Sequence, residues 1–533
     1  MVRTFFWTAR LAVVLSACLL VSAQTDELDL SAPIEVLDSS PPIEQLEISA
    51  TTDSVSTQSV SSNGCSALSS AGLRSLLLYP SNPAYASREA SYWSPIAALG
   101  PQCIVQPRST ADVSKVVKAL ARAKAKFAVR SGGHVLWAGG SDIKDGVTID
   151  LGLMTAVTYN SQTKIVSIQP GPRWGDVYNT LAPLGVTVTG GRDAGVGIGG
   201  FLTGGGLSFL SGRNGLACDQ VVRFEVVLAD GRIVHADCTS NRDLWKALKG
   251  GWANYGIVTR FDVTSTPLTT AWGGFNLHDK SVGPQVTTAL VNFINNLRQN
   301  PDNAHIALAA YNSFMPGETS IGTFAINTLG VENATALREI LQVPAIARDL
   351  DFLTLGEIGE KFKDPSDDRV IWHTLTFNND VNIANKALAL HDELVARLKS
   401  TLGADKFNSQ CVLQPLPSLF AEIGARQGGN VLGLDSLNRN SILWVGSVGF
   451  QNAAYQQAAH DAVSAYARAL ESYAQSRNGN VAFRYINYAD KDQNPLRSYG
   501  TTNVNFIKRV AAKYDPTGVF QKQVPGSFKV SAI

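Results

Sequence analysis

Glycine is concentrated between residues 190 and 206, and this stretch constrains the fold more than any other part of the chain. Nine of its seventeen residues are glycine. Because glycine has no Cβ atom, such a backbone can closely approach another backbone, a phosphate or a flat ring. Gly195, Gly197 and Gly200 also match G-x-G-x-x-G after a strand-like segment, 186–189, which is typical of a dinucleotide site. The surrounding βαβ pattern is poor and glycines this dense match by chance, so a structural loop stays an alternative.

A shorter glycine turn follows a predicted strand at 127–130. Its residues are Arg130, Ser131, Gly132, Gly133 and His134, with Gly139, Gly140 and Ser141 shortly after. The two central glycines can direct backbone donors toward a phosphate, and Arg130 can supply positive charge. A loop histidine such as His134 is, by itself, more often a surface residue than a ligating or catalytic one.

Other common chemistries fit the chain poorly. The seven histidines show no H-E-x-x-H or other metal-ligand spacing, so no metal site is predicted. The segment 446–449 has the wrong spacing for G-x-S-x-G, and no P-loop is present. The net charge of +1 gives no electrostatic reason to bind nucleic acid or an anionic membrane, so a small-molecule partner is expected.

The length of 533 residues predicts two or more domains, since single cores stop growing at about 250–300 residues. Behind Ser109, valine and leucine recur with a helical period up to Leu120. Two β-branched runs, 221–228 and 233–236, flank the hairpin turn signal Asp230-Gly231. Near residue 270 the glycine clusters give way to alternating helical and strand patterns, which predicts the start of a second domain.

The N-terminus has the pattern of a secretory signal. Arg3 and Arg10 flank the start, an apolar run covers Leu11–Val21, and the small residues at 21–23 offer a cleavage site. The run is shorter than the about 20 apolar residues that span a bilayer. Residues 1–23 are therefore predicted to be a signal peptide, and the protein is expected to be secreted or to enter the secretory pathway.

The segment after the signal, residues 24–64, is acidic and then rich in Ser and Thr, which predicts a flexible linker. The sequence Asn333-Ala334-Thr335 is a glycosylation sequon, in agreement with secretion. An odd number of cysteines remains outside the signal, so at least one lacks an intramolecular partner in an oxidising compartment. These cysteines are Cys65, Cys103, Cys218, Cys238 and Cys411.

Six ordered segments resemble the FAD-linked oxidases related to berberine bridge enzyme, within the p-cresol methylhydroxylase and vanillyl alcohol oxidase class. The segments are Cys103–Pro107, Arg130–His134, Gly195–Gly206, Gly250–Thr259, Tyr485–Asp490 and Lys513–Pro516. The resemblance implies an α+β fold with a two-lobed FAD-binding domain at 65–270. A substrate domain with an antiparallel sheet flanked by helices follows at 271–480, and a C-terminal segment, 481–533, returns to the first domain.

The resemblance also implies FAD attached through an 8α-histidyl bond to His134. Such a bond retains the cofactor and withdraws electron density from its ring, which makes it a better hydride acceptor. The other residues expected to contact the cofactor are Arg130, Ser131, Gly132, Gly133, Ser141, Gly195, Val196, Gly199, Gly200, Gly204, Gly256 and Val258.

Two positions refine this expectation. Many relatives form a second flavin bond from a cysteine three residues before the position matching Val196, and this chain has Asp193 there. A single link is therefore predicted, which leans away from carbohydrate oxidation because doubly linked relatives often have open sites for sugars. A valine at 196 resembles oxidases, whereas a leucine resembles dehydrogenases, so O₂ is the expected acceptor and H₂O₂ the product. Simple packing of Val196 is the alternative.

The segment 485–488 matches the family's near-flavin tyrosine motif. If it forms a strand, Tyr485 and Tyr488 point to opposite faces and only one faces the flavin. Tyr488 is the expected base or proton relay, with Tyr485 and Asn487 as its catalytic neighbours. An unperturbed tyrosine has a pKa of about 10, so the role requires a positive neighbour or a concerted transfer. Packing of both tyrosines in the core is the alternative.

The resemblance further implies a disulfide between Cys65 and Cys103. A pair between Cys218 and Cys238 would flank the predicted hairpin and leave Cys411 free.

Together these expectations describe a secreted, monomeric FAD-dependent oxidase that takes a hydride from a small alcohol, amine or activated C–H group. A secondary metabolite, in some cases with coupled ring closure, is the leading substrate class. An extracellular carbohydrate oxidase is one alternative, and a non-catalytic secreted flavin-binding protein is another. The segment 270–480 offers no motif that identifies the substrate.

Overall fold

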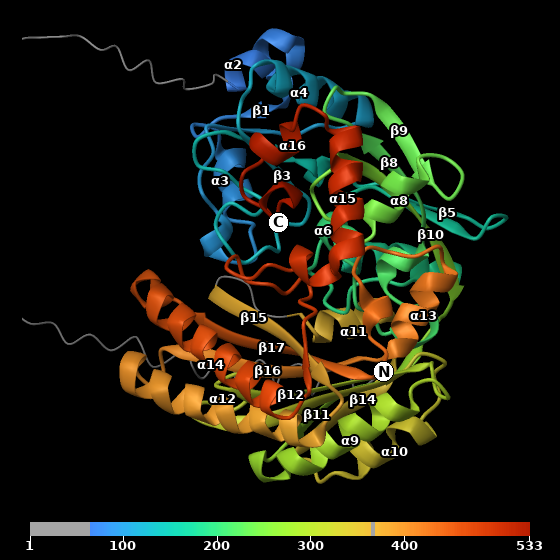
Figure 1. Cartoon of the computed structure of the whole chain (residues 1–533), viewed down its shortest axis with the longest axis vertical. Coiled ribbons are helices and arrows are strands. Elements are labelled where there is room, and N and C mark those ends of the chain that lie inside the picture. Colours follow the sequence, from blue (N-terminus) through green and yellow to red (C-terminus); the bar gives the residue numbers. More distant parts are fainter. Residues whose placement is uncertain (1–63, 364–367) are drawn as a thin grey trace, which may run out of the picture. The chain divides into compact units, whose positions relative to one another are not determined.

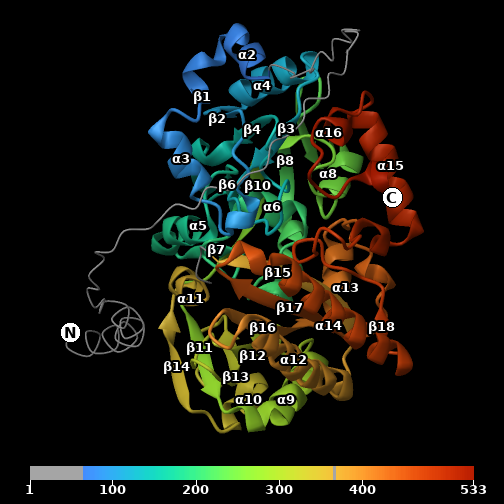
Figure 2. The same cartoon turned by 90° about the vertical axis from the view of Figure 1, so that its left-hand side faces the viewer.

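The computed structural model describes residues 64–363 and 368–533, and the strands of this part of the chain form three sheets (Figure 1; Figure 2). The first has the order β1-β2-β4-β3. Its strands are β1 (Leu77–Leu78), β2 (Cys103–Val105), β3 (Phe127–Arg130) and β4 (Val147–Asp150). Both β2 and β3 run parallel to β4. This arrangement places the end of β3, and therefore the turn that follows it, at the edge of a buried sheet.

Helix α4 (Thr110–Arg122) connects β2 to β3 and covers the first sheet. Its N-terminus forms where predicted, because Ser109 Oγ accepts a hydrogen bond from the backbone of Asp112 at 3.1 Å. The expected apolar face is buried, including Val113 and Leu120. Two further short helices, α2 (Gly64–Leu68) and α3 (Pro83–Glu89), belong to the same lobe.

The second sheet is antiparallel and built around the long strand β10 (Ile257–Pro267), which pairs with β6, β7 and β8. Its other strands are β5 (Val157–Asn160), β6 (Ile165–Ile168), β7 (Val186–Val188), β8 (Val221–Val227) and β9 (Ile233–Asp237). The predicted β8–β9 hairpin forms, and Gly231 in its turn has a φ of 79°. The helices of this lobe are α5 (Trp174–Leu181), α6 (Ile198–Thr203), α7 (Ser211–Asn214) and α8 (Arg242–Leu248).

The third sheet is antiparallel, with the order β14-β11-β13-β12-β16-β17-β15-β18 in the described chain. Its strands are β11 (Ala271–His278), β12 (Asn303–Tyr311), β13 (Thr319–Asn327), β14 (Ala347–Leu353), β15 (Arg369–Asn378), β16 (Phe407–Leu416), β17 (Ser441–Phe450) and β18 (Asn480–Val481). Helices α9 (Gly283–Asn296), α12 (Val381–Leu402) and α14 (Gln456–Ser476) contact one face of this sheet (Figure 1). Shorter helices are α10 (Arg338–Gln342), α11 (Leu355–Lys361) and α13 (Ser418–Arg426).

The C-terminal residues pack against the first two sheets. Helix α15 (Thr501–Tyr514) contacts α8, and Tyr514 donates a hydrogen bond to Asp243 Oδ1 at 2.7 Å. After α16 (Val519–Lys522), the carbonyl of Gln523 accepts from the backbone of Phe127 in β3 at 2.8 Å. The expected boundaries near 270 and 480 coincide with the ends of the third sheet, and as domain limits they stay predictions.

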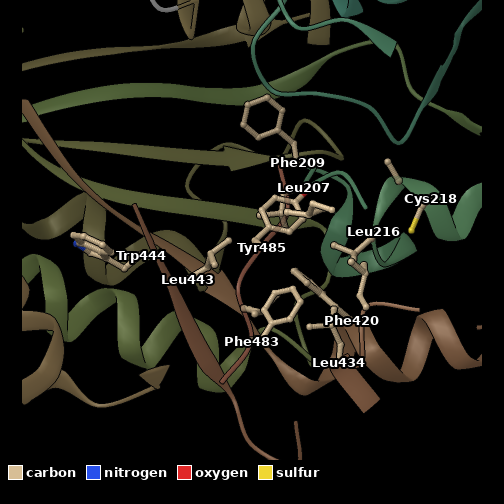
Figure 3. Packing of buried hydrophobic residues seen from close by; sticks show 14 of the residues in the cluster. Leu207, Phe209, Leu216, Cys218, Phe420, Leu434, Leu443, Trp444, Phe483 and Tyr485 are labelled. Atoms are coloured by element: carbon tan, nitrogen blue, oxygen red, sulfur yellow. The ribbon is translucent and has the colours of Figure 1, made fainter. Parts of the chain in front are cut away.

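The predicted α+β class is confirmed by the mixture of helices with predominantly antiparallel sheets. The implied disulfide between Cys65 and Cys103 is present. The proposed pair between Cys218 and Cys238 is wrong, since both thiols are free. Cys218 lies in the hydrophobic core before β8 (Figure 3), whereas Cys238 is exposed directly after β9.

The predictions about secretion and glycosylation concern the N-terminus and one surface turn. The predicted signal peptide and almost all of the predicted linker lie in residues 1–63, outside the described residues. Asn333 is exposed in a turn, and its glycosylation stays a prediction. Among the described residues, no helix combines the length and hydrophobicity needed to cross a bilayer.

Candidate active site

A cavity of about 620 Å³ lies between the two glycine-rich loops and the third sheet. This volume is within the range of about 300–1,000 Å³ that is usual for small-molecule and cofactor sites. Of the predicted site residues, those that line it are Ser131, Gly132, Gly133, His134, Ser141, Val196, Gly199, Gly200, Gly256, Val258, Asn487 and Tyr488. Arg130, Gly195, Gly204 and Tyr485 lie outside the lining.

The two glycine loops touch each other backbone to backbone. A Cβ atom on Gly132 would lie 2.5 Å from the Cα of Gly197, and one on Gly197 would lie 2.4 Å from the Cα of Gly132. Ser131 ties the loops together, because its Oγ donates to the carbonyl of Pro170 at 2.6 Å and accepts from the backbone of Gly199 at 3.1 Å. Gly132 and Gly197 are therefore needed for the two loops to pack against each other, and this packing forms the floor of the cavity.

His134 stands on this floor with its ring stacked on Trp93, at a centroid distance of 4.6 Å. Its Nε2 atom is buried and has no hydrogen-bond partner among the described residues. Burial, together with a smaller effect of the nearby Arg173 charge, lowers the pKa of His134 to about 3. The imidazole is thus neutral at physiological pH and retains a nitrogen lone pair. A buried ring nitrogen without a partner among the described residues, beside glycine loops, fits the close approach of a planar cofactor.

Arg130 has a different position from the one expected. Its guanidinium donates to the carbonyl of Arg88 at 2.6 Å and to Ser91 Oγ at 2.8 Å. It also lies 3.7 Å from the centre of the Tyr92 ring. The side chain therefore packs behind Gly133 of the turn and does not itself line the cavity.

Tyr488 faces the cavity within a group of three polar side chains. Arg192 Nη2 donates to the Tyr488 hydroxyl at 2.8 Å and also to Gln414 Oε1. The Tyr488 hydroxyl in turn donates to Gln414 Oε1 at 3.3 Å. Arg192 belongs to the glycine-rich stretch 190–206 and Gln414 to β16. The fold therefore brings a positively charged neighbour to the tyrosine from a distant part of the chain. A charge-assisted hydrogen bond of this kind is shorter and stronger than one between neutral groups.

Tyr485 and Asn487 hold the tyrosine segment in place. The segment is a turn and not the strand considered above, with the backbone of Tyr488 donating to the carbonyl of Tyr485 at 2.9 Å. Tyr485 is buried in the core beside Leu207 (Figure 3), and its hydroxyl accepts from the backbone of Gly206 at 2.7 Å. Burial raises the pKa of Tyr485 far above the usual value. The packing alternative thus describes Tyr485, while Tyr488 alone of the pair lines the cavity.

Asn487 packs directly against Gly204, a glycine that does not line the cavity. Its Nδ2 donates to the carbonyl of Phe201 and to the Tyr485 hydroxyl, both at 3.1 Å. A Cβ atom on Gly204 would lie 1.9 Å from Asn487 Oδ1. Gly204 is therefore required for close packing of the tyrosine segment on α6.

Asp193 shapes the loop that carries Val196. Its Oδ1 accepts from the backbone of Gly195 at 2.5 Å. The carbonyl of Gly195 accepts from Arg173, which fixes the peptide on its other side. Asp193 and Val196 both line the cavity, whereas Gly195 forms the bend between them.

The third sheet forms the wall opposite the glycine loops, and the individual residues of this wall were not identified from the sequence. Alternate residues of β16 line the cavity: Asn408, Gln410, Val412 and Gln414. Trp372 of β15 joins them and meets the Tyr488 ring edge-on at 5.4 Å. Strand periodicity could have shown that every second residue shares a face. It could not have shown which of the two faces meets the cavity, because both faces of this sheet are covered.

A family model described as an FAD binding domain matches residues 101–237. The FAD-dependent monooxygenase drtC of Aspergillus calidoustus is 36% identical over 454 residues, which cover 84% of this chain and 86% of the relative. The FAD-dependent monooxygenase sdcF of Emericella nidulans is 37% identical, covering 87% of this chain and 98% of the relative.

Solved structures show the same fold at lower identity. The xylooligosaccharide oxidase from Myceliophthora thermophila C1 superimposes with a TM-score of 0.69 at 19% identity, covering 87% of this chain and 99% of that one. A variant of berberine bridge enzyme gives a TM-score of 0.68 at 16% identity, covering 88% and 99%. The chain belongs to the family of FAD-dependent oxidoreductases that includes drtC and sdcF, and it has the fold of berberine bridge enzyme.

Proposed function

We propose that this enzyme is a secreted oxidase that takes a hydride from a small organic substrate while Tyr488 receives the accompanying proton. The observation that carries the proposal is the 2.8 Å hydrogen bond from Arg192 Nη2 to the Tyr488 hydroxyl inside the cavity. For this step the phenol passes its own proton to solvent, and Arg192, which donates to the oxygen, keeps it in position to accept the proton from substrate. Gln414 accepts from the same hydroxyl and fixes its direction.

We propose that FAD is bonded once, through His134. FAD supplies the two-electron acceptor for the hydride when it is bound. His134 provides a neutral imidazole with a buried, unpartnered nitrogen, and Trp93 stacks on the ring and orients it. The glycine loops provide the close approach, with Gly199 and Gly200 on the cavity wall. Asp193 occupies the position where many relatives have the second attachment cysteine, so this position offers no thiol for a second link.

The substrate is proposed to be a small, mostly apolar organic molecule with at least one polar group, such as a secondary metabolite bearing an alcohol, an amine or an activated C–H bond. Apolar cavity residues of the third sheet, including Ile306, Leu308, Val412 and Trp372, favour an apolar body. Gln410 and Ser447 add polar contacts from the same sheet. A carbohydrate substrate is the alternative, since a polysaccharide-fragment oxidase shares the fold.

The names of the sequence relatives favour a second candidate reaction. Both relatives described above are called monooxygenases, so transfer of one oxygen atom from O₂ to the product is the competing outcome. The oxidase reaction converts each O₂ consumed into one H₂O₂ and leaves the product without a new oxygen atom. Val196 lies on the cavity wall, where simple packing also accounts for it, and it does not distinguish the two reactions.

Purified enzyme incubated with a panel of metabolite alcohols, amines and sugars under isotopically labelled O₂ tests the proposal. We expect one equivalent of H₂O₂ for each product formed and no label in the product. Label in the product would establish the monooxygenase reaction. Turnover of sugars alone would show that carbohydrates, and not secondary metabolites, are the substrates. For secretion, the mature protein recovered from the medium should begin at Gln24, and retention of residues 1–23 would contradict it.

A further inference from the structure

Three metal-ligating side chains meet on the face of the third sheet that is turned away from the cavity. They are His373 on β15, His460 on α14 and Asp490 in the loop after β18. Successive residues of a strand point to opposite faces, and Trp372 lines the cavity, so His373 points toward α14. The sequence spacing of these residues gave no sign of a metal site, because three separate segments supply them.

The donor atoms lie close enough together to approach the separations of a metal coordination sphere. His460 Nε2 is 3.2 Å from Asp490 Oδ1, and His373 Nε2 is 3.8 Å from the same oxygen. The three ligand atoms all lie within 4.8 Å of one another. Bonds of about 2.0–2.1 Å at tetrahedral angles separate ligand atoms by about 3.3–3.4 Å. Side-chain rotations that shorten the longer separations would centre a cation among them.

Asp492 offers a fourth donor. Its Oδ2 lies 3.2 Å from His460 Nε2, and Lys491 holds its other oxygen at 2.8 Å. Its side chain is 54% exposed, whereas those of His373 and Asp490 are 8% and 7% exposed. Two imidazoles and two carboxylates match the ligand types and the charge of one divalent cation.

One hydrogen bond for each ring nitrogen does not account for all the close contacts in this cluster. His460 Nε2 faces oxygens of two carboxylates at equal distances, yet a ring nitrogen carries at most one proton. His373 Nε2 is too far from Asp490 Oδ1 for a hydrogen bond and has Ser464 Oγ at 3.1 Å. A cation at the centre interacts with all of these donors at once.

We propose that His373, His460 and Asp490 bind one Zn²⁺ ion, with Asp492 completing the coordination. The ion has a structural role, because none of the three ligands lines the cavity. It joins β15, α14 and the loop that carries Tyr488, which lies two residues before Asp490. Gln493 orients that loop on β15, since its Oε1 accepts from the backbone of Asp490 at 3.1 Å and its Nε2 donates to the carbonyl of Thr374 at 2.8 Å.

Calorimetric titration of the tag-free holoenzyme with Zn²⁺ after chelator dialysis tests the site. We expect one equivalent to bind and the unfolding temperature to rise with added Zn²⁺. Co²⁺ should also bind and give the intense visible absorption of a tetrahedral site. His460→Gln and His373→Gln should each weaken Zn²⁺ binding at least 10-fold, while His235→Gln, an exposed histidine on β9, should leave it unchanged.

Asp492→Asn keeps the test decisive if a buried histidine variant does not fold, because this side chain is largely exposed. It should fold normally and weaken Zn²⁺ binding. The proposal is overturned if the wild-type holoenzyme shows no saturable Zn²⁺ binding, or if His460→Gln binds Zn²⁺ as tightly as His235→Gln.

Discussion

Replacing Tyr488 with phenylalanine removes one oxygen atom from the cavity wall and keeps the ring that Trp372 contacts. The lost hydroxyl accepts from Arg192 at 2.8 Å and donates to Gln414 at 3.3 Å. Arg192 and Gln414 still bond each other in the variant. The fold should therefore be preserved while the proton acceptor is lost.

The expected loss follows from the role of each group. A positioned general base contributes about 10²–10⁴-fold to a rate, so Tyr488→Phe should slow hydride transfer by that factor. Hydrogen bonds to charged groups contribute about 1.5–3 kcal/mol, which is roughly 10- to 150-fold in rate for Arg192→Gln. Because both changes remove the same interaction, the double variant should be little slower than Tyr488→Phe alone.

Anaerobic stopped-flow measurement of flavin bleaching isolates this step from the reaction with O₂. Tyr485→Phe is the matched control: its hydroxyl binds Gly206 in the core, so it should lower the unfolding temperature and leave the bleaching rate within a few-fold of wild type. The reasoning is refuted if Tyr488→Phe bleaches as fast as Tyr485→Phe, or if the losses from Arg192→Gln and Tyr488→Phe multiply fully in the double variant.

Three further changes test other parts of the structure. Acid-denatured wild type should retain yellow, fluorescent flavin and His134→Ala should release all of it, whereas retention by the variant would place the bond elsewhere. The Cys65–Cys103 bridge closes a loop with a sequence separation of 38, so the double serine variant should lose about 4 kcal/mol of unfolding free energy in denaturant titrations, and an unchanged midpoint would contradict this. Burial lowers the pKa of His391 from 6.5 to about 4, so between these pH values the unfolded chain binds a proton that the folded protein does not. The free energy of unfolding therefore decreases as the pH falls through this window. His391→Gln should flatten the unfolding temperature across that window, and an equally steep fall would count against it.

Local patterns predicted the elements of the first two lobes well because each reports on its own neighbourhood. The cap at Ser109 and the turn at Gly231 depend on a few adjacent residues, and both form as expected. The Cys218–Cys238 pair failed because proximity to a hairpin does not fix side-chain direction. Arg223 pairs with Asp237 in the hairpin, which leaves Cys238 beside the exposed strand end while Cys218 turns into the core.

The candidate site divides in the same way. Motif residues such as His134 and Tyr488 reach the cavity because a contiguous loop carries each of them. Their partners were not predictable, since Arg192 and Gln414 lie in stretches whose patterns describe a glycine loop and an ordinary strand. The role expected of Arg130 also depended on distant residues, because Arg88 and Tyr92 determine where its guanidinium lies.

The position of the proposed base depends on the third sheet as well as on the flavin-binding lobes, whose Gly206 and Phe201 hold the tyrosine segment. Gln414 of β16 binds the Tyr488 hydroxyl, and Gln493 fastens the following loop to Thr374 of β15. Arg192 is the one contact described for that hydroxyl from the first two lobes. The sheet that forms the substrate wall therefore also positions the proton acceptor. Substitutions near Gln414 must alter the base and the substrate contacts together, whereas Ile306 and Leu308, on β12, line the cavity without touching this network and can change the substrate fit separately.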